Sequence, residues 1–257
     1  MRPLVTIAAL ALTTSTLAAQ DYTAPRNATV PAATARRIQV IGRAGSLRID
    51  GRSGARDVTV RGTARASSRR ALEEIQLIAE ERNGTIYVEA DIPEHRGWNW
   101  DDDNQMLDLT IEVPTDLPLD VEDGSGDLEI RNVAGLDVSD GSGDAVIEHV
   151  GGYLRARDGS GELHIADVRG NVEVTDGSGQ LDIRDVHGGV EIGSKGSGEL
   201  RITSIEQSVH IRAKGSGSVD VAHVGGDFTV DRKASGGIAY EDVKGRVDIP
   251  VARRRWR

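Results

Sequence analysis

The pattern that organises this chain is clearest in the stretch Val172-Glu-Val-Thr-Asp-Gly-Ser-Gly-Gln-Leu-Asp-Ile-Arg-Asp-Val-His-Gly188. Apolar and polar residues alternate on both sides of the central Gly-Ser-Gly, which is typical of β-strands with one buried face. Each unit therefore predicts a strand, a glycine-rich corner, a second strand and a second corner. The corner recurs as six copies of Gly-Ser-Gly and one of Ala-Ser-Gly, with serines at Ser125, Ser142, Ser160, Ser178, Ser197, Ser216 and Ser235.

A repeat of this length indicates structural units that stack on their neighbours. We predict an all-β fold, a parallel β-solenoid (β-helix) of about seven rungs of 17–19 residues with an irregular β-rich N-terminal cap. An antiparallel meander is the alternative, because Asp-Gly between alternating strands also signals a hairpin. The solenoid is favoured because its two strands bury their apolar faces against each other. A meander would need a second layer, and the chain has only one convincing helical stretch, residues 67–75.

The chain divides into five segments. Residues 1–19 are expected to be a secretory signal peptide, since Arg2 precedes an apolar run and small residues. A retained membrane anchor is disfavoured, because that run is too short to span a bilayer. Residues 20–35 are expected to form a flexible leader, 36–113 the β-rich cap, 114–251 the solenoid and 252–257 a basic tail. No other segment is expected to cross a membrane, so the protein should be exported to the periplasm or cell surface, or secreted.

Within the predicted cap, alternation indicates several strands without a regular repeat. Asn83-Gly84 is a strong signal for a hairpin turn. One short helix is expected over residues 67–75. Strands are expected at residues 38–41, 47–49, 58–64, 76–82, 85–90 and 106–113.

Composition excludes several functional classes. The net charge of −10 argues against general nucleic-acid binding. The lack of cysteine removes disulfides, thiol catalysis and cysteine-based metal sites. The sequence contains neither a Gly-x-Ser-x-Gly elbow nor a His-x-x-x-His pair, and its six histidines are scattered. We therefore expect a protein that is not an enzyme.

The first corner of the early repeats is rich in carboxylates. Clustered carboxylate oxygens suit Ca²⁺, which makes this the one candidate metal site and Ca²⁺ the only cofactor considered. The pattern lacks the Gly-Gly-x-Gly-x-Asp calcium repeat, so we favour the alternative that the aspartates form side-chain-to-backbone turns and stay solvated. The candidate ligands are Asp123, Asp127, Asp140, Asp144, Asp158, Glu162 and Asp176.

From the fifth repeat onward, the corner gains one residue and its aspartate is replaced by Lys195, Lys214 or Lys233. This predicts a rod whose acidic edge turns basic toward the C-terminal end. Such polarity would suit recognition by a partner, or end-to-tail pairing of two rods. Repeat drift along a solvated edge is the alternative interpretation.

Two further segments are candidate ligand contacts. Trp98 and Trp100 stand beside three consecutive aspartates and resemble a carbohydrate- or peptide-contact patch, since indole faces supply contact area. The alternative is a loop whose tryptophans fold over the cap. The tail residues Arg253, Arg254, Arg255 and Trp256 suit anionic lipid or polysaccharide, although chain ends are usually solvated and unstructured.

The repeat, introduced by Ile111-Glu-Val-Pro114, resembles the bacterial putative-adhesin family, a domain of unknown function built of β-strand repeats. The opening Val40-Ile-Gly-Arg-Ala-Gly-Ser-Leu-Arg-Ile49 is similar to the start of that family. The likeness covers roughly residues 36–250 and implies an extracytoplasmic β-solenoid. The family offers no established catalytic residue to transfer. The lysine-bearing late corners and the arginine-rich tail depart from its pattern.

Together these features predict a non-enzymatic, exported β-solenoid that binds a protein or polysaccharide ligand at the cell envelope or surface. A self-assembling envelope scaffold, with rods joined through ends or edges, is the main alternative. A polysaccharide hydrolase that uses the corner carboxylates as acid and base is disfavoured, because these form a repeated column and not one pair in unlike environments.

Overall fold

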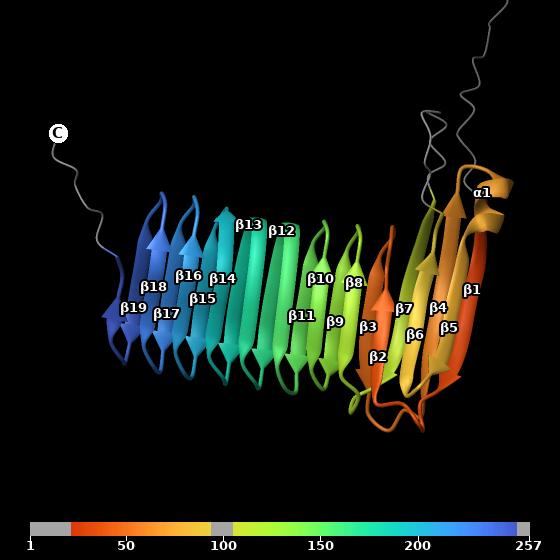
Figure 1. The fold of residues 1–257 in the computed structure, drawn as a ribbon, viewed down its shortest axis with the longest axis horizontal. Helices are drawn as coiled ribbons and strands as arrows, with labels where there is room; N and C mark the ends of the chain where they lie inside the picture. Colours follow the sequence, from red (N-terminus) through yellow and green to blue (C-terminus); the bar gives the residue numbers. More distant parts are fainter. Residues whose placement is uncertain (1–21, 94–104, 251–257) are drawn as a thin grey trace, which may run out of the picture.

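The computed structural model describes residues 22–93 and 105–250. It confirms the predicted parallel β-solenoid, in which the repeats stack one on another to form a rod (Figure 1). Strands β12 (Leu154–Val168) and β13 (Val172–Val186) each run unbroken through the first corner of their turn. The strands of the repeats are β8 (Leu119–Asp123), β9 (Leu128–Val133), β10 (Leu136–Asp140), β11 (Ala145–Val150), β12 (Leu154–Val168), β13 (Val172–Val186), β14 (Val190–Ser197), β15 (Leu200–Ile205), β16 (Val209–Lys214), β17 (Val219–Val224), β18 (Phe228–Lys233), β19 (Ile238–Val243) and β20 (Val247–Asp248).

Equivalent residues of successive turns pair in register. Leu181, for example, pairs with Leu163 of the preceding turn and Leu200 of the following one. The inward residues of both strands are buried aliphatic side chains, and one turn contributes Val172, Val174, Leu181, Ile183 and Val186. The narrow interior explains why the core needs few aromatic residues.

The solenoid begins inside the segment that we expected to be cap. β2 (Arg37–Ile41) pairs in parallel with β8, and β3 (Leu47–Arg52) pairs in parallel with β9. The corner between β2 and β3 has the same backbone shape as the corners of the repeats. Gly45 in this corner has φ 124°, and Gly126 in the next turn has φ 127°. The predicted boundary at residues 113/114 is therefore wrong. The sequence did not reveal this first turn of the solenoid, because the Gly-Ser-Gly motif is not intact at its corner.

The true cap is inserted between β3 and β8. It comprises β4 (Asp57–Ala66), α1 (Arg69–Glu74), β5 (Gln76–Arg82), β6 (Thr85–Asp91) and β7 (Met106–Pro114). β6 pairs in parallel with β2, and β7 pairs in parallel with β3, so both sheets of the solenoid continue into the cap. Asn83 and Gly84 have φ of 55° and 82°, which confirms the predicted hairpin turn between β5 and β6.

Part of the segment predicted as a flexible leader is a strand. β1 (Tyr22–Pro31) pairs antiparallel with β4 along its whole length, so the prediction for residues 20–35 is wrong there. Arg26 fastens it to the cap, since its guanidinium donates to the carbonyl oxygens of Ile75 (2.9 Å) and Leu72 (3.0 Å). Pro25 and Pro31 concealed the strand, but prolines are tolerated at the edge of a sheet, where β1 lies.

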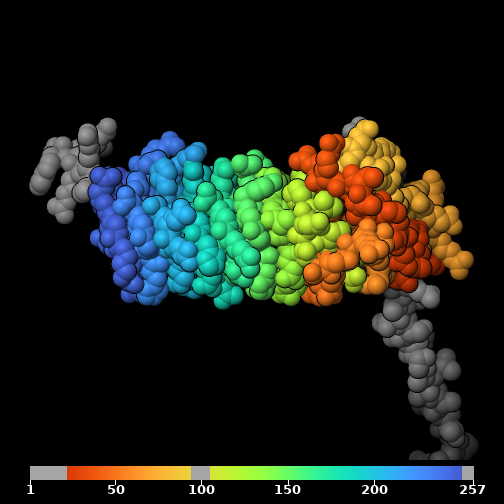
Figure 2. Space-filling model, turned by 90° about the horizontal axis from the view of Figure 1, so that it is seen from below, coloured from red at the N-terminus to blue at the C-terminus, as the bar shows by residue number. Residues whose placement is uncertain are grey.

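The two ends of the rod differ. Figure 2 shows the cap at one end and the last turns at the other, with the intervening turns as successive bands. The described helix α1 has six residues. Within residues 22–93 and 105–250, no helix is long and apolar enough to cross a membrane.

The last glycine of each Gly-Ser-Gly corner should not tolerate replacement by a residue with a side chain. A Cβ on Gly161 would lie 1.7 Å from the carbonyl oxygen of Gly143, and Gly161 has φ +139°. We expect Gly161→Ala to lower the free energy of unfolding by roughly 2–4 kcal/mol, measured by urea denaturation. Gly237→Ala is the matched control, because a Cβ there meets nothing within 4 Å. Equal losses in the two variants would contradict this account of the corner.

Candidate functional site

The second corner of each turn begins with a residue in the left-handed backbone conformation. These residues have φ between 47° and 61°, and each stands directly before the valine or isoleucine that ends the second strand. Asn, Asp and His adopt this conformation more readily than most other residues with a side chain. The members of this left-handed row are Asn132, His149, Asp167, Asp185, Ser204, His223 and Asp242.

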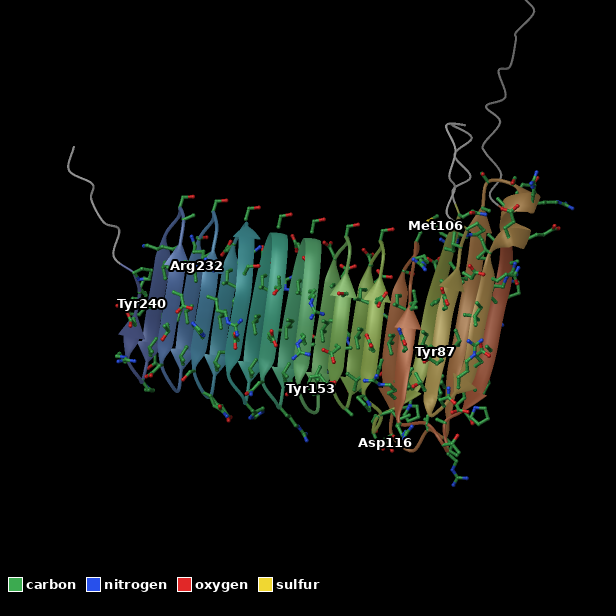
Figure 3. The ribbon with its side chains drawn as sticks, viewed as in Figure 1. Tyr87, Met106, Asp116, Tyr153, Arg232 and Tyr240 are labelled. Carbon is green, nitrogen blue, oxygen red and sulfur yellow. The ribbon has the colours of Figure 1, made fainter. Side chains whose placement is uncertain are left out.

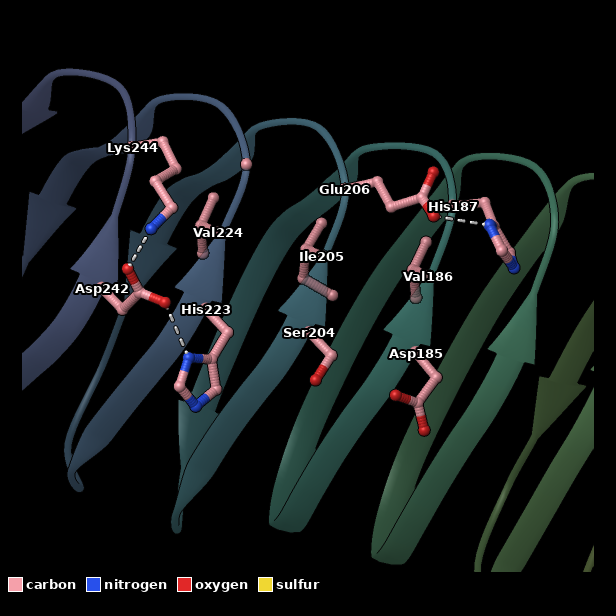
Figure 4. Close-up of a pocket in the computed structure, with 11 residues that line it drawn as sticks. Asp185, Val186, His187, Ser204, Ile205, Glu206, His223, Val224, Asp242 and Lys244 are labelled. Carbon is pink, nitrogen blue, oxygen red and sulfur yellow. Dashed lines mark hydrogen bonds and ion pairs between the residues drawn. The ribbon is translucent and has the colours of Figure 1, made fainter.

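Over the last four repeats, the left-handed row forms one wall of a groove of about 490 Å³, which we call the corner groove (Figure 4). The opposite wall consists of the residues two positions later in each turn. The valine and isoleucine between the walls form an apolar floor. The lining residues are Asp185, Val186, His187, Ser204, Ile205, Glu206, His223, Val224, Gly225, Asp242 and Lys244.

Hydrogen bonds fix several of the groove's side chains. His187 Nδ1 lies 2.8 Å from Glu206, and His223 Nδ1 lies 3.0 Å from Asp242. Lys244 also donates to Asp242 at 2.6 Å. The hydrogen bond from Lys244, and then that from His223, lowers the pKa of Asp242 below its usual value. Asp242 therefore remains ionised at neutral pH.

Ser204, His223 and Asp242 occupy three successive turns, which invites comparison with a Ser-His-Asp triad. Such a triad requires the serine hydroxyl to lie within hydrogen-bonding reach of the imidazole. Among the described residues, His223 is held by Asp242, but no hydrogen bond joins it to Ser204. The described groove therefore lacks the contact that activates a serine nucleophile.

A second depression, about 660 Å³ in volume, lies on the outer face of the sheet that the first strand of each turn forms. It runs from β10 to β16. Tyr153, labelled in Figure 3, is 46% exposed, and its ring lies over Gly135 of the preceding turn. Its hydroxyl hydrogen-bonds to Asp137 (3.1 Å), and Arg155 bridges Asp137 and Glu173 at 3.0 Å each. Tyr153, Asp137, Arg155 and Glu173 therefore engage one another across this surface.

The aspartates that precede the first corner point into the core. Asp123, Asp140 and Asp158 are each 7% exposed and Asp176 is 1% exposed, so the expectation that they stay solvated is wrong. The reason is strand alternation, since Asp176 takes the next inward slot after Val174. In-register pairing places the four side chains in successive turns, and we call them the carboxylate column.

The carboxylates that follow the corner lie elsewhere. Asp127, Asp144 and Glu162 are exposed on the outer surface, so the structure does not bring the seven candidate calcium ligands together. Within the described part of the chain, no three His, Asp or Glu side chains are grouped to hold a metal ion. Calcium binding stays a prediction without a grouped set of ligands. The carboxylate column, being buried, is also out of reach of a polysaccharide substrate.

The lysines of the later corners continue the same column inside the core. A register shift after Val174 accommodates the extra residue and places Lys195 opposite Asp176. Lys195 is 2% exposed, and its Nζ lies 2.9 Å from Asp176 and donates to the carbonyl oxygens of Gly179 and Ser197. The predicted polarity along a surface edge is therefore wrong, because the change from acid to base occurs in the interior.

Lys214 is also buried, and its Nζ donates to the carbonyl oxygens of Gly217 and Ser235. Burial, and then repulsion by Lys233, lowers the pKa of Lys214 below its usual value. Backbone carbonyls thus hold the two buried lysines that follow the carboxylate column. The ion pair between Lys195 and Asp176 joins these lysines to the column.

The remaining predicted contacts lie outside the described residues. They are Trp98 and Trp100 in the acidic loop and Arg253, Arg254, Arg255 and Trp256 in the tail, and their roles stay predictions. Sequence reasoning missed the corner groove altogether. The signal that could have found it is the small set of Asn, Asp, His and Ser residues that recurs before each strand-ending valine or isoleucine.

The buried ion pair should be far more sensitive to substitution than a surface pair. Lys195→Met leaves the Asp176 carboxylate buried without a counter-ion, and we expect it to lower the free energy of unfolding by roughly 3–5 kcal/mol at pH 7.5. Adding Asp176→Asn should restore much of that loss. The control is Arg201→Met, which removes an exposed pair with Glu199 (2.7 Å) and should cost about 0–1 kcal/mol. Similar costs for Lys195→Met and Arg201→Met would contradict the role assigned to the buried pair.

Comparisons with solved structures find bacterial proteins that are similar to this chain. A crystal structure described as a putative adhesin from Bacteroides fragilis is 16% identical, covers 89% of this chain and 97% of its own, and has a TM-score of 0.51. One described as a putative lipid binding protein from Parabacteroides distasonis is 14% identical, with coverage of 87% and 96% and a TM-score of 0.41. At 16% identity, the likeness to the Bacteroides fragilis protein shows the fold alone. No curated protein matches the chain.

The family assignment rests on the sequence pattern as well as on the fold. The pattern of the Toastrack DUF4097 family, a domain of unknown function, matches residues 49–243. This match spans the solenoid from β3 to β19 together with the inserted cap. It confirms the resemblance inferred from the repeats, and the chain belongs to the Toastrack DUF4097 family.

Proposed function

We propose that this protein is a non-enzymatic binding module, exported from a bacterium, that holds a ligand of the cell envelope or surface in the corner groove. The observation that carries the proposal is the groove itself, where polar walls keep in register over four turns above an apolar floor. Its volume of about 490 Å³ is typical of ligand sites. The description of a protein with this fold as a putative adhesin supports the same class of function.

The repeated spacing favours an extended polysaccharide as the ligand. Successive turns of a parallel sheet lie ~4.8 Å apart, so the left-handed row offers hydrogen-bonding groups at regular intervals along the rod. No hydrogen bond or ion pair engages the side chains of Asp185 and Ser204 within the described structure, so they are free to bind hydroxyl groups. A protein ligand is the other choice and would use the same walls.

Binding should depend on the two free polar groups of the corner groove. We expect Asp185→Ala/Ser204→Ala to weaken polysaccharide binding by about tenfold or more, since a hydrogen bond to a charged group contributes ~1.5–3 kcal/mol. Isothermal titration against purified envelope polysaccharides of the source bacterium would measure this. Asp127→Ala/Asp144→Ala is the control, because it removes exposed carboxylates beside the opposite corner. Equal binding by both variants would reject the groove, and binding only to an envelope protein would reject the polysaccharide.

A self-assembling scaffold is the second candidate function, and one observation favours it. Tyr240 takes the inward slot that Val221 and Ile202 occupy in the preceding turns, yet it is 52% exposed. Within the described residues, β19 pairs only with β17, so its other edge is open at this end of the rod (Figure 1). Open strand edges are templates for pairing with another chain.

Self-assembly through this end makes a distinct prediction. The mass measured by light scattering should rise with protein concentration, and Tyr240→Ser should reduce that rise by removing apolar contact area. Tyr153→Ser is the control, because it removes an exposed tyrosine from the side of the rod. A monomer at every concentration would count against the scaffold and leave the binding function in place.

A further inference from the structure

The carboxylate column is the largest group of buried charge that the binding function does not use. Asp140 and Asp158 are each 93% buried, and neither oxygen of either carboxyl group has a hydrogen-bond donor of good geometry in the described structure. Buried carboxylates without donors are costly to ionise. A protonated carboxyl group avoids that cost and can itself donate a hydrogen bond to its neighbour.

The surroundings of the column offer little compensation for negative charge. At its N-terminal end Asp123 lies over Gly42, where a Cβ would be only 2.2 Å from Asp123 Oδ1. At the other end only Asp176 has a counter-ion, Lys195. Lys214 and Lys233 lie in the next two turns, beyond Lys195.

The strands packed around the column add no other charge to the interior. Their inward side chains are aliphatic, among them Val121, Leu128, Val138, Ala145, Ala156, Leu163, Val174 and Leu181. The nearby charged residues of the same corners are exposed on the outer surface, namely Glu122, Asp127, Asp144, Arg157 and Glu162. Solvent therefore screens these outer charges, whereas the members of the column repel one another across the core.

We propose that the carboxylate column is a proton-controlled latch, which holds the first corners of β8–β13 together when protonated and loosens them when it ionises. The moving element is the Gly-Ser-Gly corner of these turns, where strands stack through backbone atoms alone. Its residues are glycine and serine, so no large side chain opposes local opening. The lysine-bearing corners of the later turns have no such carboxylates and stay closed.

The direction of the response follows from the surroundings of each carboxyl group. Burial raises the pKa of Asp123 from 3.8 to about 6. Burial, with repulsion from Asp123, raises the pKa of Asp140 to about 6. The carboxyl group of Asp158, and then the nearby amides of Gly141 and Ser142, oppose this rise without reversing it. Burial, and then repulsion from Asp176 and Asp140, raises the pKa of Asp158 to about 7, although the positive charge of Lys195 acts in the opposite direction.

Because these pKa values are higher in the folded state than in the unfolded chain, the column stabilises the fold at low pH. Its contribution is fully present below about pH 4 and is lost as the pH rises through about 6 to 7. An exported protein meets such changes, since external pH is not buffered by the cell. The latch does not depend on the corner groove, which lies at the other corner of later turns.

The test is the pH dependence of stability in the mature full-length protein. Urea midpoints and backbone hydrogen exchange would be measured from pH 5 to 8, with exchange corrected for its intrinsic pH dependence. We expect the midpoint to fall across this range. The local opening constant at Ser142 and Ser160 should rise by about tenfold or more, while that at Ser216 should stay unchanged.

Two variants with the same change in formal charge separate the latch from general electrostatics. Asp140→Asn/Asp158→Asn should flatten the pH dependence and be more stable than the wild type at pH 8. Asp127→Asn/Asp144→Asn should keep the wild-type dependence. Equal pH dependence in the two variants would overturn the proposal.

A direct titration covers the case in which the first variant does not fold. Carbon-13 NMR of the wild-type aspartate carboxyl groups should show at least three that titrate near pH 6–7. Titration of every aspartate near pH 4 would overturn the latch. If the pH dependence of the wild type disappears in millimolar calcium but not in EDTA, a metal controls the column and the proton latch is also wrong.

Discussion

The close approach of backbone to backbone at the first corner is the constraint on which the rest of the structure depends. A Cβ added at Gly143, Gly161 or Gly179 would fall within 2 Å of the carbonyl oxygen of the preceding turn. Only glycine fits there, and its positive φ at the third corner position turns the chain at a fixed point in each repeat. Because every turn bends at the same place, equivalent residues of successive turns are forced into register.

Strict register has a consequence that an ordinary sheet can avoid. A side chain at one slot stacks on the same type of side chain in the next turn. The favourable or unfavourable contact between like side chains is therefore repeated along the rod. At aliphatic slots this builds a continuous core from Val, Ile and Leu. At the slot before the first corner it stacks carboxylate on carboxylate, and repulsion between like charges grows with each turn added. The replacement of aspartate by lysine at Lys195 ends that accumulation, since the first lysine neutralises the last aspartate.

The architecture could be predicted from the sequence because it follows from a repeated pattern. The candidate site could not be predicted. Its features depend on the direction of particular side chains and on the backbone conformation of particular residues, which the repeat pattern does not determine. The corner aspartates were expected in solvent, as Asp-Gly turns usually are, but alternation from Val174 carries Asp176 inward. β1 was missed because its two prolines resemble a leader, although an edge strand tolerates them. The corner groove depends on positive φ at Ser204 and His223, and neither residue signals that conformation strongly by itself.

The same register divides the rod into two halves with different chemistry. The carboxylate column occupies the first corners of β8–β13, whereas the corner groove lies at the second corners of β13–β19. The two features meet in the turn of β13, where Asp176 pairs with Lys195 and Asp185 begins the groove. Since Asp176 keeps its counter-ion, ionisation of the other three carboxylates concentrates repulsion in the turns before β13. The groove can therefore keep its shape while the acidic half of the rod responds to pH.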